Sequence, residues 1–263
     1  MKRIMFIAAL LLVAGTFSAC ATGEALSGKD VVKGYALNGA YTELEVGNAI
    51  TAVISTEADS VYVTTDKDFI DYVSVRQDRG KLSLEVSPAM KYRFAGGMPD
   101  IKVIVPVSNS LEGIDVHGAS SVSSDSLITA GVLTVGLSGA SGLRADIRAK
   151  SLSVDLSGAS DMKGSISADK AEIELSGASS ARLCGTVRSC SAVISGASGL
   201  KGLDGSLLEV EDLLFDLSGA SSARVTCNGS ISGKASGASS LVYDGNAATE
   251  KVSASGASSV RRK

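Results

Sequence analysis

Apolar residues alternate with polar ones along most of the chain, and this period of two predicts β-strands. In the first part of the chain, alternation is clear at Leu44–Val46, Val61–Val63, Val73–Val75, Leu82–Val86 and Ile101–Val105. Polar and glycine-rich segments such as "DRGK" and "AGGMPD" separate the runs, as expected for short strands with one buried face. We therefore expect an all-β protein in which residues 35–112 form an irregular, β-rich N-terminal section.

From residue 113 the sequence repeats around the motif Ser-Gly-Ala-Ser. The motif glycines recur at intervals of 18 to 23 residues, most often 19, at Gly118, Gly139, Gly158, Gly177, Gly196, Gly219, Gly237 and Gly256. In most repeats the positions two and four before the glycine, and four after it, are apolar. A period near twenty with internal alternation, and without room for a helical stripe, predicts a parallel β-helix, or β-solenoid. Residues 113–263 would form eight coils of about 19 residues, stacked about 4.8 Å apart.

The motif itself has a structural explanation as a repeated corner. Glycine adopts backbone angles that are closed to other residues. We expect the alanine to fill a narrow inward site, and the serine hydroxyls to bond along the stack or to satisfy turn amides. The eight glycines are therefore predicted to be structural corner residues.

The N-terminus, "MKRIMFIAALLLVAGTFSAC", is typical of a bacterial export signal. A basic start, a short apolar run and the sequence "FSAC" predict a signal peptide over residues 1–19 and lipidation of Cys20. Residues 20–34, small and polar, would be a tether. The membrane is then a partner through the lipid, and the protein would be an outer-membrane lipoprotein on the cell surface or the periplasmic face. The alternative is a soluble secreted chain that begins with cysteine.

Composition excludes some classes of function. Without Lys2 and Arg3 the mature chain would carry 23 basic and 28 acidic residues, and no basic patch lies beside aromatic residues, so nucleic acid is not an expected partner. Cys184, Cys190 and Cys227 would serve as small apolar filler or form one disulfide. The single histidine, His117, is far from them in sequence, so we predict no metal site, and no cofactor.

Two columns of charge run across the coils. Five residues after the glycine, five consecutive repeats carry a cation: Arg144, Lys163, Arg182, Lys201 and Arg224. Such a row could bind acidic glycans or anionic headgroups, or its long side chains could simply splay into water and protect the sheet. Three residues before the glycine, acids recur with interruptions at Asp115, Asp155, Glu174 and Asp216. The interruptions favour a solvated face over a calcium ladder.

Two local features could carry chemistry. The 23-residue interval between Gly196 and Gly219 contains an insertion, and insertions in solenoids often lie on a binding face. Glu209, Glu211 and Asp212 are our candidate insertion-loop residues. Asp115, His117 and Ser120 have the residue types of a catalytic triad, but no nucleophile elbow accompanies them, so no catalytic residues are predicted.

The order of these features resembles a known family. A lipobox, the segments "AITAVIS", "SVYVTTD", "IDYVSV", "GKLSLEV" and "IKVIVPV", and then glycine-centred "DLSGAS" coils are similar to the Bacteroidetes proteins called putative auto-transporter adhesins with a head GIN domain. The resemblance covers roughly residues 35 to 263 and implies a β-solenoid in the cell envelope. Many relatives carry Gly-Ser-Gly followed by Asn or Asp at the coil motif; here Asp161 is the one acid that directly follows a Ser-Gly-Ala-Ser.

Three functions remain open from the sequence. The leading hypothesis is a lipid-anchored, non-enzymatic adhesin that binds a glycan or an envelope protein through its solenoid face. The first alternative is a structural scaffold of the envelope. The second is a polysaccharide-active enzyme, since parallel β-helices can host such chemistry, but most predicted loops here are too short to carry it.

Overall fold

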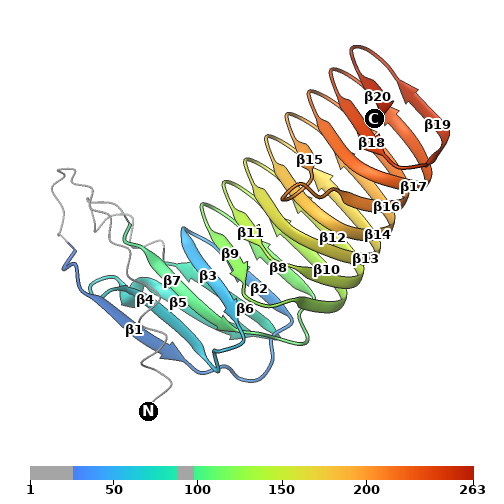
Figure 1. Cartoon of the computed structure of the whole chain (residues 1–263). Helices are drawn as coiled ribbons and strands as arrows, with labels where there is room; N and C mark the ends of the chain where they lie inside the picture. Colours follow the sequence, from blue (N-terminus) through green and yellow to red (C-terminus); the bar gives the residue numbers. More distant parts are fainter. Residues whose placement is uncertain (1–25, 88–97) are drawn as a thin grey trace.

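A computed structural model describes residues 26–87 and 98–263. The predicted signal peptide, Cys20 and the first part of the predicted tether lie outside the described residues. The described part is all-β apart from one short 3-10 helix, and its strands stack into a long β-solenoid of about eight turns (Figure 1). The predicted fold class is confirmed. Within the described segments, no helix is long and apolar enough to cross a membrane.

The described part of the N-terminal section contains seven strands and the 3-10 helix. Their bounds are β1 Asp30–Tyr35, β2 Glu43–Val46, β3 Ile50–Ser55, β4 Val61–Asp66, η2 Ile70–Tyr72, β5 Val73–Asp78, β6 Lys81–Val86 and β7 Ile101–Pro106. The tether prediction for residues 20–34 is therefore wrong at its C-terminal end, because β1 begins at Asp30 and pairs with β4 along its whole length. The buried carboxylate of Asp66, at the end of β4, accepts hydrogen bonds from Ser27 Oγ and Gly28 N and so holds the approach to β1.

The N-terminal strands do not follow the order of the chain. Strand β2 lies between β6 and β8, and β3 lies between β7 and β9, with all four pairings parallel. Two antiparallel pairs, β5 with β6 and β4 with β7, continue the two rows outward, and β1 then pairs with β4. The result is a cap that closes the N-terminal end of the stack, at the blue end of Figure 1.

The coils follow from residue 113. Their strands are β8 Gly113–Val116, β9 Ser121–Ser124, β10 Ile128–Leu137, β11 Gly142–Arg144, β12 Ile147–Leu156, β13 Asp161–Leu175, β14 Ser180–Ile194, β15 Gly199–Lys201, β16 Leu208–Leu217, β17 Ser222–Ala235, β18 Ser240–Asp244, β19 Ala248–Ala254 and β20 Ser259–Arg262. Each pairs in parallel with the equivalent segment of the next coil. At the C-terminal end, β20 pairs only with β18, so its other edge is open.

The apolar columns predicted from the sequence form the core. Residues two before the motif glycine, from Val116 to Ala235, are buried, and so are those four after it from Val122 to Leu241. Only the last coil departs, because Ala254 at its equivalent position is exposed where no further coil covers it. Aligned columns let each side chain pack against its own equivalents above and below, which is why one sequence pattern serves every coil.

The corner glycines behave as predicted. All eight have φ between 70° and 77°, in the left-handed region that other residues rarely adopt. The expected inward alanine is wrong: all eight motif alanines are exposed, and the serine that follows is the buried residue. From Ser120 to Ser239 these serines are 1–3% exposed and form a polar row inside the solenoid. Only the glycine itself departs from the alternation, because the buried residues two before it, two after it and four after it keep the period of two.

The three described cysteines are free thiols. Cys190 and Cys227 are buried in the core cluster, so of the two alternatives the apolar-filler role is the one the structure has. Burial raises the pKa of the Cys190 thiol to about 12, with a smaller contribution from nearby Cys227. No disulfide joins them.

Candidate functional site

Four of the five predicted cations form a straight row on the surface of the solenoid. Arg144 is in register with Lys163, Lys163 with Arg182, and Arg182 with Lys201. Stacking therefore places four basic side chains about 4.8 Å apart from coil to coil. The pairing with the next coil ends at Leu200 opposite Ala223, one residue before Arg224. The chain leaves the coil after Lys201, so Arg224 is not in register with the row. We call Arg144, Lys163, Arg182 and Lys201 the basic row.

One acid lies beside the middle of the basic row. Asp161 forms an ion pair with Lys163 Nζ at 3.0 Å and accepts a hydrogen bond from Arg182 Nη2 at 2.9 Å. It therefore offsets part of the repulsion between neighbouring cations. Arg144 and Lys201 form no ion pair with any residue in the described ranges, so no acid offsets the positive charge at either end of the row.

The insertion lies elsewhere than predicted. Glu209, Glu211 and Asp212 are in strand β16. The insertion is at residues 202–207, six residues that stand where the preceding coil has only Leu183 and Cys184. There Leu203 and Ser206 exchange both backbone hydrogen bonds at 2.9 Å around the turn Asp204-Gly205. Both turn residues have positive φ, 51° and 84°, as in the tight turns that Asp-Gly favours. Asp204-Gly205 thus forms the turn of the insertion, whereas Glu209 and Glu211 follow the alternation of buried and exposed residues that begins at Leu208.

The small hairpin borders a polar hollow over the basic row. Leu203 and Asp204 line it together with Arg144, Lys163 and Arg182. The hollow measures about 470 Å³. Asp146 also borders it, but its carboxylate accepts from Ser165 N at 2.8 Å. The basic row could be predicted from the sequence, whereas the hairpin that closes one side of it could not.

The acidic column is in register but is not a metal ladder. Asp115, Gly136, Asp155, Glu174, Val193, Asp216 and Lys234 occupy equivalent positions in successive coils. Asp216 pairs with Lys234 at 3.1 Å. The one group with metal-ligating geometry in the described segments is Glu45, Glu85 and His117, whose ligand atoms lie within 4.8 Å of one another.

The Glu45 group is occupied by internal contacts. Ser83 Oγ donates to Glu45 at 2.8 Å, and Lys81 Nζ lies 3.3 Å from the same carboxylate. Partial burial disfavours the charged carboxylate, but these two contacts and His117 outweigh it, so the pKa of Glu45 lies below its usual value. A lysine already neutralises this carboxylate, and we assign no metal to the group.

The residue types of a triad are not assembled for catalysis. Ser120 is buried, and its hydroxyl accepts from Ile50 N at 3.3 Å. The ion-pair partner of His117 is Glu45 at 3.9 Å, and the imidazole ring lies where a side chain at Gly47 would stand. The serine thus serves the corner of the solenoid.

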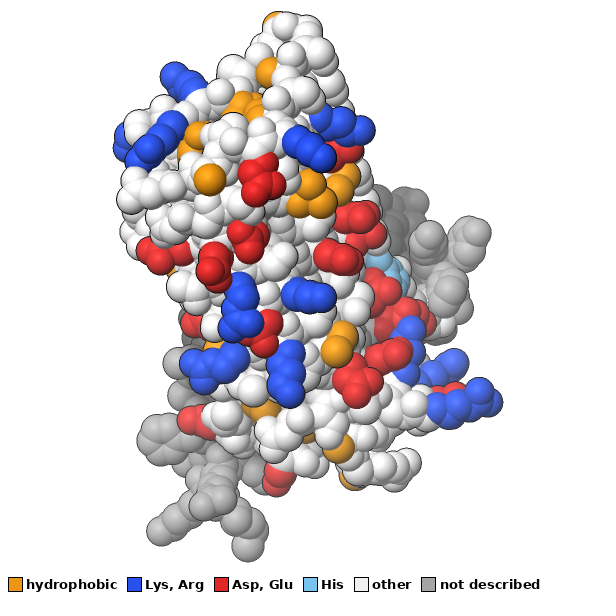
Figure 2. Space-filling view, turned by 90° about the vertical axis from the view of Figure 1, so that its right-hand side faces the viewer, with side chains coloured by type: hydrophobic (Ala, Val, Ile, Leu, Met, Phe, Trp, Pro, Cys, Tyr) orange, Lys and Arg blue, Asp and Glu red, His pale blue; other side chains and the backbone are white. Residues whose placement is uncertain are grey.

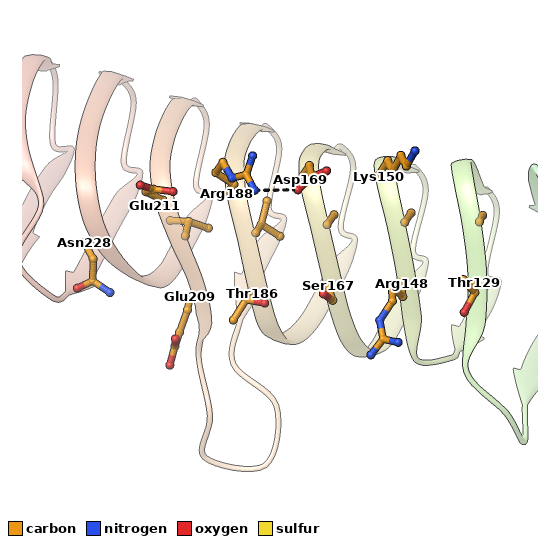
Figure 3. A pocket seen from close by; sticks show the side chains of 15 residues that line it. Thr129, Arg148, Lys150, Ser167, Asp169, Thr186, Arg188, Glu209, Glu211 and Asn228 are labelled. Atoms are coloured by element: carbon orange, nitrogen blue, oxygen red, sulfur yellow. Dashed lines mark ion pairs between the residues drawn. The ribbon is translucent and has the colours of Figure 1, made fainter.

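A second hollow, about 650 Å³, runs along another edge of the solenoid (Figure 3). Its floor is a column of small apolar residues: Ala130, Ala149, Ala168, Val187 and Val210. Polar and charged side chains flank the floor on both sides. Glu209 and Glu211 line this groove. They align with the charged residues of the earlier coils because the chain returns to the same register after the insertion. Figure 2 shows side chains of both signs gathered along one face of the solenoid.

One family model and several solved structures are similar to this chain. A family model described as "putative auto-transporter adhesin, head GIN domain" matches residues 40–247. The chain belongs to this family. The match spans the N-terminal cap apart from β1, and most coils, including the basic row and the groove. No curated protein sequence matches the chain.

Solved structures share the fold. A putative adhesin from Parabacteroides distasonis is 20% identical with a TM-score of 0.79, covering 90% of this chain and 98% of that one. A putative adhesin from Parabacteroides merdae is 16% identical with the same TM-score, covering 90% and 97%. A further P. distasonis protein, called a putative lipid binding protein, is 17% identical with a TM-score of 0.74, covering 90% and 98%. At these identities the likeness concerns the fold alone.

Proposed function

We propose that this protein is a lipid-anchored, non-enzymatic adhesin of the cell envelope that binds an acidic glycan or an acidic protein surface along the basic row. Membership of a family described as adhesins supports the general role. The single observation that carries the ligand chemistry is the in-register stacking of Arg144, Lys163, Arg182 and Lys201. A regular line of cations suits a polymer that repeats its negative charge.

The hollow beside the row supports the same proposal. The Asp204-Gly205 hairpin stands at the side of the row and gives an otherwise flat surface a wall. Asp161 sets the affinity, because a ligand must compete with it for Lys163 and Arg182. A cell-envelope anchor at Cys20, from the sequence "FSAC", would hold this surface close to extracellular or periplasmic polysaccharide.

The test compares two fourfold variants of equal charge. Arg144, Lys163, Arg182 and Lys201 are changed to Gln in one; the exposed residues Lys29, Lys170, Lys251 and Arg261 are changed to Gln in the other. Binding to arrays of acidic glycans and to envelope fractions is measured at low and physiological salt. The row variant should lose at least about tenfold in affinity, the control little, and Asp161→Asn should bind more tightly.

Two outcomes would overturn the ligand chemistry. One is the absence of binding to any acidic glycan or envelope fraction, and the other is equal binding by both fourfold variants. Unchanged function of the row variant in cells would favour the structural scaffold instead. The anchor is tested separately: Cys20→Ala should move the protein out of the membrane fraction, and protease treatment of intact cells should remove a surface-exposed protein but spare a periplasmic one.

A further inference from the structure

The groove of Figure 3 lies where each coil bends. Lys150, Asp169, Arg188 and Glu211 fall in the register gaps of the ladders, so their side chains project from the bend. Across the apolar floor, Arg148, Ser167, Thr186 and Glu209 are in register with one another. Two parallel rows of side chains therefore flank the groove (Figure 3). We call them the Arg148 row and the Lys150 row.

The charges in these rows follow an antisymmetric order. One coil carries two cations, Arg148 and Lys150; the next carries Asp169, the next Arg188, and the last carries two anions, Glu209 and Glu211. Beyond each end the positions are uncharged, with Thr129 at one end and Asn228 at the other. Reversing the direction of the solenoid therefore replaces every charge by its opposite, about a centre between Asp169 and Arg188.

Charges at the two ends of the groove cannot satisfy each other within one chain. Arg148 and Glu209 are three coils apart, about 14 Å at the usual strand spacing. Within the described residues neither Arg148, Lys150, Glu209 nor Glu211 forms a side-chain ion pair, and all four are exposed. Only the central pair is closed internally, with Arg188 Nη2 3.2 Å from Asp169 Oδ1.

A second copy of the chain would supply the missing partners. A two-fold axis across the groove, between the Asp169 and Arg188 coils, turns the second solenoid antiparallel while each row faces its own equivalent. Arg148 then faces the second copy's Glu209, Lys150 faces its Glu211, and Asp169 faces its Arg188. A two-fold axis along the solenoid would instead place Arg148 against Lys150 and Glu209 against Glu211, which like-charge repulsion opposes.

The small floor residues permit close approach of the two copies. Alanine occupies three successive coils of the floor and valine the next two, so no large side chain keeps the flanking rows apart. Isologous contact of one surface with itself is the commonest way in which soluble chains associate. We propose that the protein forms an antiparallel homodimer through this groove, with the Arg148 and Lys150 coil of each copy paired to the Glu209 and Glu211 coil of the other.

The first measurement is sedimentation velocity of the whole protein over a range of concentration and salt. The dimer should dissociate as salt rises, because exposed ion pairs are screened. Arg148→Glu with Lys150→Glu, or Glu209→Lys with Glu211→Lys, should each weaken dimerisation at least about tenfold. Equal mixing of these two double variants should restore dimers, which shows that each variant is folded. As controls, the double reversals Arg144→Glu/Lys201→Glu and Glu172→Lys/Glu174→Lys should leave dimerisation unchanged.

A fourfold variant that carries both double reversals tests the direction of the two copies. In the antiparallel arrangement its charges are again complementary, so it should dimerise with itself about as well as the wild type. It should not pair with the wild-type chain, because their like charges would then face each other. A wild-type protein that stays monomeric up to about 1 mM, dimers insensitive to the reversals, or free mixing of the fourfold variant with the wild type would each overturn the proposal.

Discussion

Gly158 lies directly above Gly139, so that a Cβ atom on Gly158 would stand 2.5 Å from the Gly139 carbonyl oxygen. That oxygen already accepts the backbone N–H of Ala159 at 2.7 Å. The same contact is present at seven of the eight corners, from Gly139 to Gly256, at distances between 2.4 and 2.9 Å. At each of these corners, the glycine of the preceding coil therefore leaves no space for a side chain.

We expect Gly158→Ala to destabilise the protein strongly. Its φ of 73° alone costs an alanine about 1–3 kcal/mol, and the clash with Gly139 adds to that. Thermal unfolding followed by circular dichroism would measure the loss. The matched control is Ala159→Ser, which changes an exposed neighbour and should shift stability by about 0.5 kcal/mol or less. Equal stability of the two variants would contradict the steric role of the glycine column.

The buried serine row gives a prediction with an internal control. Ser179 Oγ donates to the Ser176 carbonyl at 2.7 Å, whereas buried Ser221 Oγ has no partner among the described residues. Ser179→Ala should therefore cost about 1 kcal/mol, and Ser221→Ala should be neutral or stabilising, since it removes an unsatisfied polar group. Chemical denaturation of both variants would measure the difference. A larger loss at Ser221 would show that its hydroxyl has a role that the contacts do not reveal.

The thiols should differ in reactivity. Burial raises the pKa of Cys190 to about 12 and also raises the pKa of Cys227, so little reactive thiolate exists at pH 8. With an aromatic disulfide reagent, the native protein should show Cys184 reacting first, because it is only partly buried. The other two should react upon unfolding. Rapid reaction of all three in the native state would mean that the solenoid opens far more readily than its core suggests.

Acid should destabilise the N-terminal cap. For Asp66, burial disfavours the charge, but hydrogen bonds from Asp68 N, Ser27 Oγ and Gly28 N outweigh it, so the pKa of Asp66 is lowered. A lowered folded-state pKa adds stability above the unfolded value, near 4, and this stability is lost as pH falls through the folded value. Glu45 acts in the same direction. Melting temperatures should hold from pH 7 to about 5 and then fall.

The variant Asp66→Asn separates this effect from general charge. It should be less stable than the wild type at pH 7 and should lose less on acidification, and amide hydrogen exchange should be faster in β1. The exposed substitution Glu57→Gln serves as the comparison and should follow the wild-type pH profile. An unchanged profile for Asp66→Asn would place the acid-sensitive groups outside the cap.

The coils could be predicted from the sequence because their register is set by one steric rule. Each glycine fixes a corner, and the columns of Leu, Ile and Val then fall inward, as the basic row falls outward. Alternation also predicts an outward Ala159 and an inward Ser160, because buried Leu156, Ser160 and Met162 are an even number of residues apart. Apolar character alone favoured the alanine, whereas the buried serine is satisfied by the corner carbonyl at Ser157.

The cap and the groove could not be predicted for a different reason. The pairing of β3 with β9 joins residues about seventy positions apart in the chain, and parallel strands with an intervening section leave no local signal. Predicting the groove charges requires the register of the coil that follows residues 202–207. Glu209 aligns with Thr186, but a count of residues gives this alignment only if the extra residues of the hairpin are left out. Glu209, Glu211 and Asp212 were predicted to lie in a loop, and this prediction is wrong because they lie in β16.

The interleaved cap gives the molecule a direction of growth. Strands β2 and β3 each lie between a strand of the cap and a strand of the first coil, so a further coil could not be inserted there without breaking existing pairs. At the other end, β20 ends the stack with one edge open. Duplication of a nineteen-residue unit near the C-terminus would lengthen the rod by about one strand spacing and leave the cap intact. The reach of the rod away from the proposed anchor at Cys20 can thus be adjusted one coil at a time.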